Sequence, residues 1–241
     1  MTEASSWRAW LKTRNRRPEL MDRPDLDPRL HRQALSGLAR INRVSATARQ
    51  LWPELERLAR GVSGRPVRVL DVACGGGDVA VGLAKLARRR GVRIDVRGCD
   101  ISPTALDYAR ERAAENGLEV GFFEHDVLED RLPECDAIVC SLFLHHLSSQ
   151  QAARFIGSLT AAAHLSVQIS DLLRTALGYA FAVVGCRVLS RSPVVHIDGP
   201  RSVAAAFTIA EVHALAARSE LRDVRIARRF PERFQLLWRA R

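Results

Sequence analysis

The sequence predicts an α/β fold in which a doubly wound, mostly parallel sheet carries helices on both faces. Short apolar segments typical of buried strands alternate with helical segments between residues 67 and 171. A glycine-rich turn joins the first strand segment to the helix that follows it. The length of 241 residues suits one such core with an accessory segment.

The segments follow one another in a regular order, and several carry recognisable end signals. Ser102 is a typical N-cap and Gly117 a typical helix stop, while Thr208 and Glu211 form a capping-box pattern. Strands are predicted over 67–73, 93–100, 119–126, 135–144, 165–171 and, near the end, 223–229 and 234–240, with helices over 78–90, 103–117, 150–163 and 208–218. Regular βα repetition of this kind is typical of a parallel sheet.

Two segments lie outside this repetition. Residues 1–62 are predicted to be an N-terminal arm and helical lid, with two helices between 31 and 59 and Pro53 in the first turn of the second. Residues 63–241 would form the core. Within it, the long apolar stretch 171–207, interrupted by glycine and proline, is interpreted as an insertion that covers a substrate pocket.

Composition narrows the class of protein. Hydrophobic residues make up 47% of the chain and charged residues 27%, which is typical of a soluble globular domain. No uncharged apolar run reaches eighteen residues, and the N-terminus has no apolar signal-peptide core. The scattered cysteines fit neither a disulfide framework nor a zinc site, so we expect free thiols in the cytoplasm: Cys74, Cys99, Cys135, Cys140 and Cys186.

The net charge of +10 leaves several partners open. It would suit a nucleic acid or an anionic membrane surface, or reflect general arginine usage. The apolar stretch 177–184 could line a hydrophobic pocket, touch a membrane surface or simply pack against the core. We expect a small-molecule acceptor, no nucleic acid, no membrane span, and a monomer or homodimer.

The strongest chemical signal is VLDVACGGGDVA, where Asp71 ends a strand and Gly75 and Gly77 form a turn before a helix. Glycines there let the backbone approach a ligand closely. With Ala80 they also satisfy a permissive dinucleotide pattern, so the turn alone does not identify the cofactor. Asp71 favours a cofactor with an ammonium group, because a carboxylate would repel a pyrophosphate.

Acidic residues also end the next two predicted strands. Asp100 closes GCDIS, where a carboxylate can bind a ribose diol, and Asp126 closes EHDV, where it can accept from an adenine amino group. Ile101 and Val127 would supply apolar walls beside them. Each acid alone is more often a turn residue, but together they lie at the sheet edge where α/β folds bind ligands.

These residues resemble the strand-one, strand-two and strand-three motifs of the class I methyltransferase family, over residues 67 to about 170. The resemblance implies a Rossmann-like seven-stranded sheet, S-adenosylmethionine (SAM) across the strand edges, and in-line methyl transfer to a nucleophile. Ala73 and Cys74 depart slightly from the usual motif, and Ala73 and Ser141 are expected in the cofactor site. The flanking segments are similar to bacterial tailoring methyltransferases of secondary metabolism that act on quinone or polyketide phenols.

Two adjacent histidines follow the fourth predicted strand in CSLFLHHL. His146, or else His145, could act as the base that deprotonates a phenol whose pKa is about 10. The alternative is that these histidines only cap the turn after the strand.

Four further residues are candidates for the acceptor site. His31 and His196 are alternative bases, the latter oriented by Asp198, although each could be an ordinary surface histidine. Asp171 and Arg174 could anchor a polar substituent or form a surface salt bridge. No cluster at metal-ligand spacing stands out, so no metal is expected.

Three other functions use similar features. An RNA methyltransferase would explain the basic RNRR segment, but the base-gripping tetrad and Pro-Cys motif are absent. A nicotinamide-dependent reductase shares the fold and turn, yet neither Tyr108 nor Tyr179 has the lysine of a Tyr-x-x-x-Lys pair. A non-catalytic module that binds the cofactor for regulation is the third.

Overall fold

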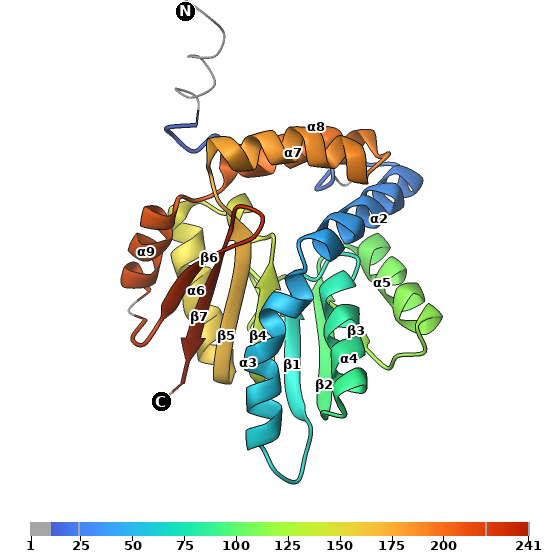
Figure 1. Cartoon of the computed structure of the whole chain (residues 1–241), viewed down its shortest axis with the longest axis vertical. Coiled ribbons are helices and arrows are strands. Elements are labelled where there is room, and N and C mark those ends of the chain that lie inside the picture. The colour runs from blue at the N-terminus through green and yellow to red at the C-terminus, as the bar shows by residue number, and fades with distance from the viewer. Residues whose placement is uncertain (1–10, 24, 220, 241) are drawn as a thin grey trace, which may run out of the picture.

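The sheet has seven strands in the order β3-β2-β1-β4-β5-β7-β6 (Figure 1). The computed structural model describes residues 11–23, 25–219 and 221–240. Neighbouring strands from β3 to β5 pair in parallel, and β7 runs antiparallel to β5 and β6. The strands are β1 (Val67–Val72), β2 (Ile94–Asp100), β3 (Gly121–Glu124), β4 (Cys135–Ser141), β5 (Ala163–Leu172), β6 (Arg225–Arg229) and β7 (Arg233–Arg239). The predicted α/β fold with a mostly parallel, seven-stranded sheet is confirmed.

Helices cover both faces of this sheet. Successive side chains of a strand point to opposite faces, so the sheet has one apolar core on each face. Val67 and Val69 of β1 pack with α3 and α4, whereas Leu70 and Val72 pack with α6 and α9 on the other face. The helices are α2 (Pro28–Val44), α3 (Thr47–Gly61), α4 (Asp78–Arg90), α5 (Pro103–Glu115), α6 (Ser149–Ala162), α7 (Ala176–Leu189), α8 (Pro193–Ala205) and α9 (Ile209–Arg218), with a 3-10 turn at Leu144–His146.

A cap lies over the carboxyl ends of the parallel strands. We call residues 11–23 the arm, and we define the cap as the arm together with α2, α7 and α8. Ala34 of α2, Cys186 of α7 and Val195 of α8 belong to a small apolar cluster separate from the two sheet cores. Figure 1 shows α7 and α8 across the top of the molecule, with α2 beside them. Among the described residues, no helix has both the length and the apolar character needed to cross a membrane.

Several element boundaries differ from the sequence expectation. Helix α2 starts at Pro28, where Asp27 caps the N–H groups of Arg29 and Leu30. Helix α3 starts at Thr47, so Pro53 lies inside it rather than in its first turn, and its apolar face packs on the sheet. The second predicted helix of the lid is therefore part of the core.

The predicted insertion is more regular than its composition indicated. Residues 193–205 form one helix despite Gly199 and Pro200. Gly199 is required there because an added Cβ would collide with the Cys186 side chain, so glycine permits close contact between α7 and α8. Strand β4 is also shorter than predicted, since it ends at Ser141 and a 3-10 turn follows.

Candidate active site

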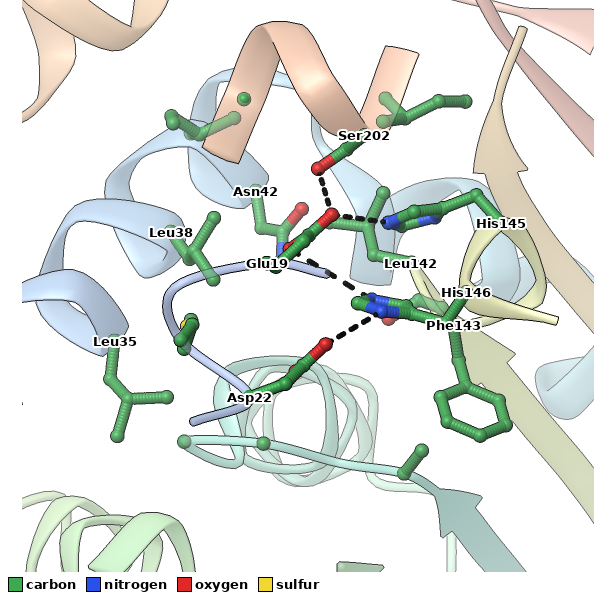
Figure 2. A pocket seen from close by; sticks show the side chains of 18 of the residues that line it. Glu19, Asp22, Leu35, Leu38, Asn42, Leu142, Phe143, His145, His146 and Ser202 are labelled. Carbon is green, nitrogen blue, oxygen red and sulfur yellow. Dashed lines mark hydrogen bonds and ion pairs between the residues drawn. The ribbon is translucent and has the colours of Figure 1, made fainter. Parts of the chain in front are cut away.

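A cavity of about 1260 Å³ lies between the cap and the carboxyl edge of the sheet. Its floor comes from the loops that follow β1, β2, β3 and β4, and its roof from α2, α7, α8 and the arm. Open α/β sheets bind ligands at this edge. Figure 2 shows side chains from the arm, α2, α8 and the turn after β4 surrounding this space.

The glycine-rich loop after β1 presents its backbone to the cavity. Ala73, Gly75 and Gly77 all have positive φ angles, of 54°, 51° and 67°. Gly75 lines the cavity, and among the described residues an added Cβ would meet only the Leu35 side chain, at 3.9 Å, so this part of the loop is an open cradle. Gly77 instead packs against Ala109 and Phe122, where a Cβ would come within 2.8 Å of each. Ala73 and Gly75 therefore face the cavity, and Gly77 supports the loop from behind.

Asp100 ends β2 and lines the same cavity. Its carboxylate accepts the backbone N–H of Gly75 at 2.8 Å and that of Ser102 at 2.9 Å. Burial raises its pKa, and these two N–H groups and His31 oppose that change. A carboxylate has about four lone-pair sites, so Asp100 can hold the loop and still accept from a ligand hydroxyl. The adjacent Ile101 is 62% exposed and also lines the cavity.

Three further predicted residues surround the cavity floor. Asp126, after β3, accepts the N–H of Leu128 at 2.9 Å through one carboxylate oxygen, which leaves the second available. Val127 is buried beside it, and Ser141 lies at the end of β4. All three line the cavity.

Asp71 lies beneath the loop rather than in the cavity wall. It is 1% exposed, and neither carboxylate oxygen has a hydrogen-bond partner among the described residues. Burial, and then the charge of Asp78, raises the pKa of Asp71 well above its usual value, while the N–H of Ala80 opposes this without completing a hydrogen bond. A buried carboxyl group without a partner is costly. A cation above the loop would favour its charged form, so the site fits a cofactor that bears an ammonium or sulfonium group.

His145 is fixed by two carboxylates. Its Nδ1 lies 2.7 Å from Asp171, its backbone N–H donates to the same carboxylate, and its Nε2 lies 3.4 Å from Glu19. Burial alone would lower the pKa of His145, but Asp171 and Glu19 outweigh it and raise the pKa to about 10. The side chain is 4% exposed and is a charged, paired group at neutral pH.

His146 has a freer environment than its neighbour. Its Nδ1 lies 3.0 Å from Asp22, and its Nε2 lies 4.0 Å from the nearest Glu19 oxygen. The side chain is 24% exposed and lines the cavity (Figure 2). Of the two histidines, it is the one whose Nε2 has no hydrogen-bonding partner within 3.5 Å in the described part of the chain.

The predicted acceptor-site residues are not brought together. His31 lines the cavity near Asp100, where burial lowers its pKa, rather than beside the tandem histidines. His196 does not line the cavity, and its Nε2 lies 2.7 Å from the Ser190 carbonyl. Asp198, expected to orient His196, accepts the N–H groups of Leu20 and Met21 in the arm.

Asp171 and Arg174 are both buried but do not pair with each other. Asp171 holds His145, while Arg174 forms a bidentate ion pair with Glu211, both distances being 2.9 Å. Arg174 also donates to the carbonyl of Leu11. Neither side chain lines the cavity, so the structure favours a role in positioning other groups over a direct anchor for the acceptor.

Sequence reasoning missed several polar residues that line the cavity, among them Glu19, Asn42, Asp78 and Arg233. Arg233 is 2% exposed and donates to Asn42 and Thr47, yet its Nε has no partner among the described residues. Burial lowers the pKa of Arg233 to about 10. Of these residues, only Asp78 could have been predicted from its neighbours, because it directly follows the glycine turn. The others reach the cavity from distant parts of the chain.

Comparison with known proteins agrees with this architecture. Residues 69–164 match the family model described as a methyltransferase domain. A ubiquinone biosynthesis O-methyltransferase of Alkalilimnicola ehrlichii is 34% identical over 132 residues, which are 54% of this chain and 50% of that protein. A demethylmenaquinone methyltransferase of Deinococcus radiodurans is 31% identical over 134 residues, which are 54% of each chain. The chain thus spans about half the length of these curated relatives.

Solved structures share the fold at lower identity. A SAM-dependent methyltransferase from Aquifex aeolicus superposes with a TM-score of 0.61 at 18% identity, covering 89% of this chain and 99% of that one. A magnesium protoporphyrin IX methyltransferase from Synechocystis, with bound S-adenosylhomocysteine (SAH), gives a TM-score of 0.56 at 19% identity over 82% and 83% of the two chains. Residues 69–164 are thus a methyltransferase domain by their match to the family model, and the chain has the fold of the SAM-dependent methyltransferases among the solved structures.

Proposed function

We propose that this protein transfers the methyl group of SAM to a small, largely apolar acceptor, namely a phenolic hydroxyl of a quinone-like or polyketide-like metabolite. The observation that carries the proposal is that the glycine-rich loop on the floor and the apolar side chains of the roof line the same cavity. Relatives named ubiquinone biosynthesis O-methyltransferase and demethylmenaquinone methyltransferase support a quinone-like acceptor.

The floor of the cavity would hold the cofactor. When bound, SAM supplies a methyl group on a sulfonium centre. Asp126 accepts from the adenine amino group, Asp100 accepts from the ribose diol, and Gly75 lets the backbone approach the amino-acid tail. Arg233 lines the cavity and its Nε has no hydrogen-bond partner among the described residues, so its guanidinium suits the tail carboxylate.

His146 would act as the base. Both ring nitrogens of His145 already face carboxylates, so that side chain has no site for a proton from the acceptor. His146 keeps its Nδ1 on Asp22 and receives the phenol proton at Nε2 as the oxygen takes the methyl group. The products are the methyl ether, SAH and a protonated His146, which later loses its proton to water.

The apolar roof would bind the acceptor. Phe181, Val184 and Val188 of α7 line the cavity together with Leu35 and Leu38 of α2. An aromatic metabolite gains affinity by burying its ring against such surfaces. The α7 side chains are also 45 to 75% exposed, which is compatible with contact between this helix and a lipid-like substrate or a membrane surface.

An RNA substrate is less well supported by the arm. Arg14 donates to the carbonyls of Ala205 and His145, and its guanidinium lies 3.5 Å from the centre of the Phe207 ring. Arg16 donates to the carbonyl of His146. These two cations of the RNRR segment therefore hold the arm on the core, which leaves fewer charges for a phosphate backbone.

Calorimetry and a transfer assay test the proposal in sequence. Titration with SAH should give 1:1 binding and titration with NADH none, which separates a methyltransferase from a reductase. Methyl-labelled SAM should then label phenols and quinols but not RNA, and His146→Asn should lower kcat by about 10²-fold or more while SAH affinity stays constant. NADH binding without SAH binding would overturn the assignment, and labelling of RNA alone would overturn the acceptor class.

A further inference from the structure

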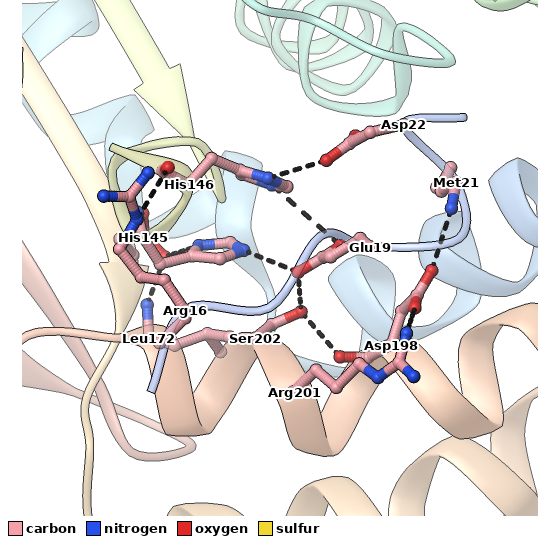
Figure 3. Close-up of polar contacts among 12 residues, drawn as sticks. Arg16, Glu19, Met21, Asp22, His145, His146, Leu172, Asp198, Arg201 and Ser202 are labelled. Carbon is pink, nitrogen blue, oxygen red and sulfur yellow. Dashed lines mark hydrogen bonds and ion pairs between the residues drawn. The ribbon is translucent and has the colours of Figure 1, made fainter. Parts of the chain in front are cut away.

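Glu19 of the arm lies between the two histidines that follow β4. One carboxylate oxygen is 3.4 Å from Nε2 of His145, and the other is 4.0 Å from Nε2 of His146 (Figure 3). One ligand atom from each of the three residues lies within 4.8 Å of the others. No sequence pattern indicates this cluster, because Glu19 is more than a hundred residues away from the histidines.

A second carboxylate contacts Nδ1 of each histidine. Asp171 lies 2.7 Å from Nδ1 of His145, and Asp22 lies 3.0 Å from Nδ1 of His146. Metal-binding histidines commonly donate their other ring N–H to a carboxylate, which fixes the ring and makes the free nitrogen a better ligand. Both Nε2 atoms here are oriented in that way toward Glu19 (Figure 3).

The cluster has more negative than positive charge, and a bound cation would reduce this excess. Three carboxylates, those of Glu19, Asp22 and Asp171, face the two imidazoles. Arg16 lines the cavity but is exposed and donates to the His146 carbonyl, and Arg14 and Arg233 act on Asp171 without forming an ion pair with it. Asp22 is 55% exposed, whereas Glu19 and Asp171 share the one charge of His145, so a further cation would stabilise the buried pair of carboxylates.

We propose that Glu19, His145 and His146 bind a divalent transition-metal ion at the junction of the arm and the core. Two imidazole nitrogens and one carboxylate are a donor set for zinc and related ions, with positions left open for further ligands. Ligands about 2.1 Å from a tetrahedral metal are about 3.4 Å apart. The Glu19–His145 pair already has this separation, and the wider pairs need to close by up to about 1.4 Å.

The site has a consequence for the reaction, and this consequence rests on the proposed function. The three ligands border the cavity, so an open metal position can take the acceptor oxygen. A divalent ion lowers the pKa of a bound hydroxyl. In the metal-bound protein the Nε2 lone pair of His146 would be engaged, so the ion rather than His146 would favour the phenolate, and the phenol proton would pass to water.

Direct metal binding, measured without cofactor or acceptor, tests the site itself. Tag-free, chelator-treated protein is titrated with Zn²⁺ in competition with a chromophoric chelator, and with Co²⁺ by visible absorption. We expect one Zn²⁺ per chain and an intense four-coordinate Co²⁺ spectrum. Mg²⁺, which prefers oxygen ligands, should not compete. Glu19→Gln and His146→Asn should each weaken Zn²⁺ binding at least tenfold.

A matched control uses the exposed pair His164 and Glu134, which lie 3.6 Å apart on the surface. His164→Asn should leave Zn²⁺ binding unchanged. Circular dichroism and SAH binding show whether each variant is folded. Absence of stoichiometric Zn²⁺ binding, or equal binding by wild type and Glu19→Gln, overturns the metal site and leaves the cluster as an ion-paired latch. SAH binding then still reports separately on the proposed function.

Discussion

The carboxylate of Asp100 accepts the backbone N–H of Gly75 at a distance of 2.8 Å. The two residues are 25 positions apart, and this hydrogen bond joins the end of β2 to the loop that follows β1. The same side chain accepts the N–H of Ser102 and so also fixes the start of α5. One side chain therefore positions the cradle and lines the cavity that it opens onto.

Replacing Asp100 should weaken cofactor binding without unfolding the chain. In Asp100→Asn, one carboxylate oxygen becomes an NH₂ group that cannot accept from the N–H it faces. Losing a charge-assisted hydrogen bond costs about 1.5–3 kcal/mol, so we expect SAH affinity to fall about 10- to 100-fold by calorimetry.

Asp95 is the matched control, because it lies on the same strand and pairs only loosely with Arg97 at 3.6 Å. Asp95→Asn should bind SAH like the wild type. An Asp100→Asn variant with wild-type affinity would show that the loop does not need this hydrogen bond.

Asp71 should release a proton when the cofactor binds. Burial and the charge of Asp78 raise the pKa of Asp71 well above its usual value, which favours the protonated form in the free protein. A cation above the loop favours the charged form and lowers that pKa, so binding releases a proton and tightens as pH rises. Calorimetry with SAM in phosphate and in Tris should therefore give different heats.

The Asn substitution isolates this effect. Asp71→Asn cannot titrate, so the difference between the two buffers should disappear. Identical heats for the wild-type protein in both buffers would mean that Asp71 does not respond to the cofactor.

Arg174 should contribute strongly to stability although it does not line the cavity. It is 5% exposed and joins Glu211 to the carbonyls of Leu11 and Ala206. Arg174→Met would remove these hydrogen bonds, and because Glu211 keeps the N–H of Thr208 and is partly solvated we expect a loss of about 2–4 kcal/mol in the free energy of unfolding. Urea denaturation measures it.

An exposed arginine gives the comparison. Arg131 is 89% exposed and lies 3.5 Å from Glu134, so Arg131→Met should change the unfolding free energy by no more than about 0.5 kcal/mol. Equal effects of the two substitutions would contradict a structural role for Arg174.

The sheet could be predicted because its signals are local. Each parallel strand has its own apolar run, and each helix start has a capping residue such as Ser102 or Thr208. The error at Pro53 arose because proline occupies the interior of α3, where propensity alone disfavours it. The α8 helix was hidden by Gly199 and Pro200, and it forms because packing against α7 overrides their weak propensity.

The candidate site was only partly predictable for a related reason. Asp100 is the last residue of β2, and Asp126 follows β3 closely. Their position at the cavity could therefore be predicted from the strand pattern. Glu19 and Arg233 reach the cavity from the two ends of the chain, and only tertiary folding brings them there. The partners of Arg174 and His196 likewise depended on contacts that spacing does not encode.

Helix α7 offers a test of the acceptor pocket that is independent of the cofactor. Phe181 lines the cavity, whereas Leu177, one turn earlier on the same helix, does not, and the two are similarly exposed at 45% and 51%. Phe181→Ala should raise the KM for an aromatic acceptor about tenfold, because it removes roughly 1–2 kcal/mol of apolar contact, and should leave SAH affinity unchanged. Leu177→Ala should leave both constants unchanged. If both substitutions raised the acceptor KM equally, α7 would act as a general apolar surface rather than through a pocket wall at Phe181.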